Sequence, residues 1–172
     1  MAAGDVKLAY AGSSNLTVTA LNGGIASSST HVSGWESAEI DNSTNKYLDY
    51  LVSGKFTVES ASLSAGEIRV WVVPRLDDST WPGGFDGTES AEATPLDDAN
   101  GTAGGAVLLK SIATDTTASQ VYYMHPCSVA SAFGGICPEK FVIFVTQSTG
   151  TTLETSGNQI TIKGVYLTVA QS

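Results

Sequence analysis

Few side chains in this sequence have the types and spacing that catalysis requires. The nearest candidate for a nucleophile with its base is Cys127 with His125, and Pro126 lies between them. Two residues at this spacing share a face only in an extended strand, which a proline does not guarantee. His31 is the only other imidazole, and no Gly-x-Ser-x-Gly motif accompanies either histidine. We therefore expect both histidines in turns or at the surface, no catalytic residue and no enzyme activity.

The two cysteines, Cys127 and Cys137, are also poor candidates for a metal site. A two-cysteine zinc site needs a second pair of ligands, and only His125 lies near in sequence. Their spacing is compatible with a disulfide, but the sequence does not fix the Cα separation. No basic and apolar leader is visible at the first residues, so we expect a protein made and kept in the cytoplasm, where thiols stay reduced.

Carboxylates gather in one turn-rich stretch. The stretch holds Asp77, Asp78, Asp86, Glu89, Glu92, Asp97 and Asp98. Calcium binds where enough oxygen ligands converge, but the order of these residues does not match an EF-hand loop. We predict a solvated acidic loop and no resident metal, with calcium at a protein contact as the alternative. The glycine pairs nearby do not form a phosphate-binding motif, so no cofactor is expected.

The elements that must position these residues are short β-type runs. Alternating or continuous apolar residues predict strands at 16–20, 35–40, 46–52, 55–58, 67–73, 106–113, 120–124, 140–146 and 159–169. Gly54 is expected to break the chain between two of these strands. Residues 128–133 predict one or two helical turns before Gly134.

The pattern predicts an all-β fold. Eight or nine strands without βαβ alternation favour antiparallel sheets packed as a sandwich, of jelly-roll type ahead of an immunoglobulin-like one. The 172 residues are expected to form a single domain, with 1–30 as an N-terminal arm or edge strand. Residues 77–105 show no periodicity, and an insertion loop this long usually carries function.

Charge and hydropathy exclude several classes of partner. The chain has 8 Lys and Arg against 17 Asp and Glu, a net charge of −9, and its basic residues are scattered. Nucleic-acid binding needs clustered cations, so we expect no nucleic-acid partner. No apolar run approaches the roughly 20 residues of a membrane span, so we expect no membrane association.

Four aromatic residues are candidates for a partner interface: Trp35, Trp71, Trp81 and Phe85. Trp81 and Phe85 lie in the turn-rich insertion, where they either anchor a partner subunit or fold back on their own sheet. Trp71 lies in a predicted strand, where it either packs within a second buried face or offers a platform for a sugar ring. Surface aromatics therefore leave a carbohydrate-binding module open.

Three segments carry a resemblance to a known family. They are residues 37–52, residues 66–73, and Phe133-Gly-Gly-Ile136 followed by residues 141–147. Their order and turn placement over about residues 25–169 resemble the jelly-roll cement or decoration proteins of tailed bacteriophages. The cysteine pair and the Trp81 loop match no feature of that family.

The resemblance implies a virion structural protein on the outer surface of the capsid. Such proteins commonly bind the lattice of the major capsid protein as homotrimers at local three-fold and quasi-three-fold positions and stabilise the head. The arm of residues 1–30 or the insertion 77–105 would then reach the neighbour. Other phage components, such as a tail or head-fibre protein, and a carbohydrate-binding β-sandwich remain alternatives. The sequence leaves open the strand order, the symmetry axis and the host.

Overall fold

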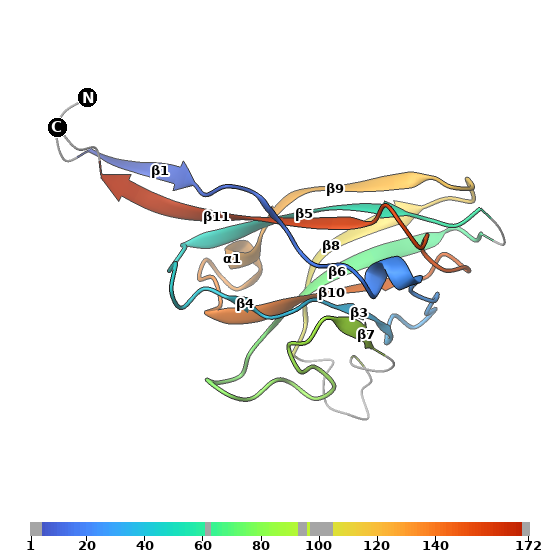
Figure 1. Cartoon of the computed structure of the whole chain (residues 1–172), viewed down its shortest axis with the longest axis horizontal. Coiled ribbons are helices and arrows are strands. Elements are labelled where there is room, and N and C mark those ends of the chain that lie inside the picture. The colour runs from blue at the N-terminus through green and yellow to red at the C-terminus, as the bar shows by residue number, and fades with distance from the viewer. Residues whose placement is uncertain (1–4, 61–62, 93–95, 97–104, 170–172) are drawn as a thin grey trace.

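Two antiparallel sheets packed face to face make up the protein in the computed structural model, which describes residues 5–60, 63–92, 96 and 105–169 (Figure 1). The first sheet has the order β1 (Val6–Tyr10), β11 (Gln159–Val169), β5 (Asp49–Thr57) and β9 (Val121–Ser128), and β2 (Ser14–Asn15) also pairs with β11. The second has the order β7 (Ser90–Glu92), β3 (Gly34–Glu36), β10 (Lys140–Gln147), β6 (Gly66–Pro74) and β8 (Val107–Thr114), and β4 (Ile40–Asp41) pairs with β10.

The pairing is nested. The first strand pairs with the last, β1 with β11, and moving inward along the chain β3 and β4 pair with β10, β5 with β9, and β6 with β8. Successive pairs fall alternately in the two sheets, which is the arrangement of a jelly roll. The predicted all-β, jelly-roll sandwich is therefore confirmed.

The core forms where the alternation in the sequence is strongest. Ile68, Val70 and Val72 on β6 are completely buried between the sheets, and Arg69 and Trp71 between them point to the opposite face. Other strands contribute large side chains to the same layer, including Trp35, Phe56, Phe141, Ile143 and Ile160. Removing these apolar surfaces from water stabilises the packing of one sheet on the other.

Strand β10 is buried on both faces. Phe141, Ile143 and Val145 face the core between the sheets, and Val142 and Phe144 face outward into a second, smaller cluster. That cluster includes Phe85, Trp81 and Leu96, which come from the insertion. The described part of the predicted 77–105 insertion thus folds back over the outer face of the second sheet, and its own strand β7 extends that sheet beside β3.

The predicted break at Gly54 is wrong. Strand β5 runs without interruption from Asp49 to Thr57, and the pairing with β9 shifts register between Val52 and Gly54. Gly54 keeps partners on both sides, Ile160 on β11 and Met124 on β9, and the extra residue of the bulge lies in β9. The strand also starts later than Lys46, because that residue has a left-handed φ of 50°.

The N-terminal residues differ from the prediction as well. Leu16, Val18 and Ala20 are partly buried against the core and Thr17 and Thr19 are exposed, but they form no strand. The Ala20 N–H bonds to the Glu89 side chain, not to a neighbouring strand. The edge strand of this region is β1, farther toward the N-terminus. The predicted helical turns are confirmed as α1 (Val129–Ala132). No helix in the described ranges is long and apolar enough to cross a membrane.

Candidate contact surface

Two tryptophan and arginine pairs lie on the outer face of the second sheet. Arg69 lies over Trp71 with its guanidinium carbon 5.9 Å from the ring centroid, and both belong to β6. Arg75 follows β6 at the same alternation and lies 5.4 Å from the ring centroid of Trp81. All four side chains are partly exposed. We call these four residues the Trp–Arg face.

Hydrogen bonds and ion pairs hold the side chains of Trp71 and Arg69 in place. The Trp71 indole N–H donates to the Thr146 hydroxyl at 3.2 Å, and Nδ1 of His31 lies 2.9 Å from the same oxygen. His31 Nε2 lies 3.6 Å from the Glu67 carboxylate, which also bonds to Arg69. His31 was expected in a turn or at the surface. It lies in a turn, but it is only 5% exposed. Burial and, to a smaller extent, the charge of Arg69 lower the pKa of His31.

A shallow hollow of about 130 Å³ lies beside this network. Thr30, His31, Arg69, Trp71 and Leu96 line it. The hollow offers an indole, an imidazole and a guanidinium group. That combination favours contact with one flat, polar group rather than enclosure of a whole ligand.

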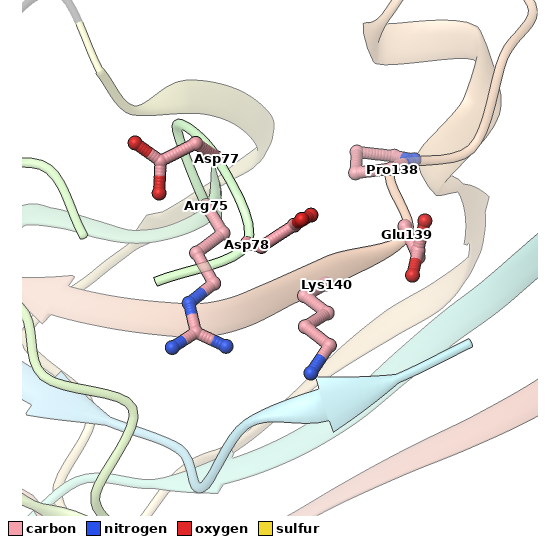
Figure 2. Close-up of a pocket in the computed structure, with 6 residues that line it drawn as sticks. All are labelled: Arg75, Asp77, Asp78, Pro138, Glu139 and Lys140. Carbon is pink, nitrogen blue, oxygen red and sulfur yellow. The ribbon is translucent and has the colours of Figure 1, made fainter. Parts of the chain in front are cut away.

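A second hollow, of about 210 Å³, lies next to the Arg75 and Trp81 pair (Figure 2). Arg75, Asp77, Asp78, Pro138, Glu139 and Lys140 line it. Figure 2 shows the side chains of Arg75 and Lys140 extending in the same direction from neighbouring parts of the sheet. The Glu39 carboxylate bridges the two cations, with 2.9 Å to Arg75 Nη1 and 3.5 Å to Lys140 Nζ. The hollow is therefore a mixed-charge surface with its cations held in place.

The four residues predicted for a partner interface separate into two groups. Trp35 is fully buried between the sheets and donates its indole N–H to Glu89 at 2.6 Å. Phe85 is 6% exposed and packs edge to face on Phe144 with ring centroids 5.2 Å apart. Trp71 and Trp81 pack against the second cluster but reach the surface. Contact with a partner stays a prediction, and within this structure Trp71 and Trp81 are the two that a partner can touch.

Two acidic side chains of the insertion, those of Asp77 and Asp86, hold its own turns. Asp77 accepts hydrogen bonds from the N–H groups of Ser79 and Thr80, at 2.8 and 2.7 Å, and Asp86 accepts one from Thr88 at 2.7 Å. Asp97 and Asp98 lie outside the described residues. Elsewhere in the described ranges, no group of three or more acidic, histidine or cysteine side chains is placed to hold a metal ion.

The cysteine and histidine candidates do not meet as a nucleophile and base. The Cys127 thiol contacts the backbone carbonyl of His125 at 3.3 Å, not its imidazole. Both Cys127 and Cys137 are free thiols. Burial raises the pKa of Cys137 to about 11, which disfavours its reactive thiolate form.

Sequence reasoning did not identify Arg69, Arg75 or the Glu39 bridge as parts of the contact surface. Arg69 precedes Trp71 by two positions in an alternating strand, and this spacing would have placed both on one face. Nothing in the spacing of Arg75 and Trp81 shows that the chain turns back between them, so only the structure brings that pair together.

Known proteins do not identify the surface. Comparison with protein-family models, with curated proteins and with solved structures finds no match to this chain.

Proposed function

We propose that the protein is a virion structural protein of a tailed bacteriophage, a decoration or cement protein. In this proposal it binds the outside of the major capsid protein lattice as a homotrimer and stabilises the head. The segments that carry the resemblance form the framework of the jelly roll: residues 37–52 hold β4 and the start of β5, residues 66–73 lie in β6, and residues 141–147 lie in β10. The strands in these segments belong to one sandwich, and this common framework supports the proposal.

The observation that carries the proposal is the Trp–Arg face. Tryptophan and arginine are among the residue types most enriched where protein interfaces concentrate their binding energy. Each indole here packs on the second cluster, and each arginine is paired with a glutamate, Glu67 or Glu39. The side chains are therefore held in place before binding, which reduces the entropy lost on contact.

A contact surface of four side chains suits attachment at many equivalent positions. Several modest contacts gain affinity through effective concentration when copies are linked in a trimer. A ligand that binds only the assembled lattice shifts the equilibrium toward the assembled form. Both effects stabilise a capsid without any catalytic group.

Co-sedimentation with undecorated heads of tailed phages tests the proposal. Wild-type protein is expected to pellet with the heads, and Trp81→Ala is expected to weaken binding by about 10- to 100-fold, as for a central aromatic contact. The matched control is Tyr123→Ala, because Tyr123 is a 66% exposed aromatic residue on β9 of the other sheet. Wild-type protein that stays in the supernatant with every head preparation would refute the proposal.

The hollow at Trp71 favours a second candidate, a carbohydrate-binding module. The indole of Trp71 offers a ring face, and Thr30 and Arg69 beside it offer polar groups, as sugar recognition requires. At about 130 Å³ it is smaller than the roughly 300–1,000 Å³ of small-molecule pockets, so it would hold part of one sugar ring. Polysaccharide that quenches tryptophan fluorescence in the wild type but not in Trp71→Ala would favour this candidate over the capsid.

A further inference from the structure

A two-stranded ribbon extends beyond the sandwich. Strand β11 pairs with β5 from Gln159 to Val165, and beyond Val165 its residues pair only with β1. The register joins Val6 to Val169 and Tyr10 to Val165. Figure 1 shows this ribbon, β1 with the end of β11, running out past the other strands of both sheets.

One face of the ribbon is apolar throughout. The residues on it are the directly opposed pairs Val6 with Val169, Leu8 with Leu167, and Tyr10 with Val165. Five of these six side chains are between 52% and 62% exposed, and only Val165, at the base, is buried. Lys7 and Ala9 alternate with the β1 residues and therefore lie on the opposite face.

An apolar face of this kind is not expected to remain in contact with water. An isolated two-stranded ribbon is marginally stable, and a ribbon gains stability by burying one face. Contiguous exposed apolar side chains on a folded protein mark a site of contact. Among the described residues, Lys163 lies over the Tyr10 ring at the base of the ribbon, with its Nζ 5.5 Å from the ring centroid. The side chains of Val6, Leu8, Leu167 and Val169 remain more than half exposed.

Charge indicates which partner fits. The two strands of the ribbon, Val6–Tyr10 and Val165–Val169, contain one of the 8 basic residues, Lys7, and none of the 17 acidic residues. Two copies of a chain with net charge −9 repel each other over most of their surfaces. They meet the least repulsion where acidic residues are absent, and the charge that lies beside the apolar face is the cation of Lys163 at its base.

We infer that the apolar face of the ribbon packs against the same face of other copies of this chain. Each copy contributes the same three cross-strand pairs, so copies arranged around a three-fold axis would turn identical faces toward that axis. This inference deepens the homotrimer in the proposed function by naming the segment through which the copies meet. It depends only on this chain, not on a capsid.

Sedimentation velocity of three proteins tests the inference over about 1–100 µM, the range in which interfaces of modest size dissociate. Wild-type protein is expected to self-associate. The double variant Leu8→Ser with Leu167→Ser is expected to raise the dissociation constant by about 100-fold or more, because two large apolar contacts are lost. The control, Leu108→Ser with Tyr123→Ser, removes two comparably exposed side chains from β8 and β9 and is expected to keep the wild-type mass.

A second measurement does not depend on weakening the fold. With Cys127 and Cys137 replaced by serine, Leu167→Cys is expected to give covalently linked copies under mild oxidation, and Tyr123→Cys under the same conditions is not. A wild-type monomer throughout the concentration range, an oligomer that the ribbon variant leaves intact, or equal cross-linking at both positions would each overturn the inference.

The two proposals fail separately. An oligomer that depends on the ribbon but does not pellet with phage heads overturns the capsid proposal and leaves this inference standing. A monomer that pellets with heads overturns this inference and the homotrimer, and leaves binding to the capsid standing.

Discussion

The side chain of Glu36 accepts a hydrogen bond from the backbone N–H of Gly87, with 2.7 Å between Oε1 and the nitrogen. This bond joins β3 to the insertion, and a longer one from the N–H of Asp86 supports it. The Glu36 carboxyl group is fully buried and its Oε2 has no hydrogen-bond partner. Burial, with the nearby charges of Glu92 and Asp86, raises the pKa of Glu36 to about 7, although the Gly87 bond opposes this shift.

The raised pKa of Glu36 predicts a stability that falls as the pH rises. The unfolded chain loses this proton near its ordinary pKa of 4.5, whereas the folded protein keeps it until about pH 7. Stability contributed by the protonated group is therefore complete at low pH and is lost progressively between these two values. The full loss is on the order of 3 kcal/mol in the free energy of unfolding.

Glu36→Gln isolates this effect. Glutamine keeps an oxygen acceptor for Gly87 but does not titrate, so the difference in unfolding free energy between variant and wild type is expected to move in favour of the variant from pH 5 to pH 8. Urea unfolding of both proteins at the two pH values measures it. Because all other titrating groups are shared, parallel pH profiles for the two proteins would contradict the prediction.

Phe85 is predicted to anchor the insertion to the sandwich. Its ring packs edge to face on Phe144 and is almost completely buried, so Phe85→Ala removes most of the contact and leaves a cavity. The expected cost is about 3–5 kcal/mol in the free energy of unfolding if the insertion and the sandwich unfold together. If the insertion detaches by itself, limited proteolysis will cut within 77–105 before the rest of the chain. Wild-type stability together with wild-type protease resistance would show that Phe85 is not the anchor.

Gly164 is predicted to be required by a close aromatic contact at the base of the ribbon. A Cβ built at Gly164 would lie 2.3 Å from two ring atoms of Tyr47. The Tyr47 ring packs against those of Tyr50 and Tyr166, at centroid distances of 5.3 and 5.9 Å, so moving it away from a new Cβ would disturb both contacts. Gly164→Ala is therefore expected to destabilise the fold by about 1–3 kcal/mol, as overpacking does.

A double-mutant cycle checks the cause of that cost. If the clash with the ring is responsible, Gly164→Ala should be less harmful in a Tyr47→Ala background than in the wild type. Thermal unfolding of the four proteins gives the interaction free energy. An additive result would mean that the cost lies in the backbone of β11 and not in the contact with Tyr47.

The strands of the framework could be predicted because their signal, the alternation of apolar residues, lies within each short segment. Period-2 alternation at residues 67–73 and 159–169 identifies β6 and β11, whose bounds in the structure differ from the prediction by at most one residue. Gly54 shows the limit of such reasoning, since a glycine that reads as a break in sequence is held within a continuous strand by pairing on both sides. Tertiary pairing outweighs the local preference there.

The contact surface was harder to predict because it depends on which segments, distant in sequence, the fold brings together. Trp35 and Phe85 were interface candidates, and for Phe85 in the insertion the alternative was that it folds back on its own sheet. Their burial is decided by the segments that pack over them. The Arg75 and Trp81 pair and the ribbon join residues that only the fold makes neighbours, as the register of Val6 with Val169 shows. Sequence periodicity assigns a face to each residue, but it does not show what covers that face.

Cys137 is predicted to react slowly with thiol reagents in the folded protein. Burial, with a contribution from the charge of Asp49, raises its pKa to about 11 from an ordinary 9. Because the thiolate is the reactive form, Cys127→Ser protein should react about 100-fold more slowly than the same chain in urea at neutral pH. The rate should keep rising above about pH 9 in the folded protein and level off in the unfolded chain. Steric shielding alone would slow the reaction without displacing this pH dependence, so coinciding pH profiles would rule out the raised pKa as the cause.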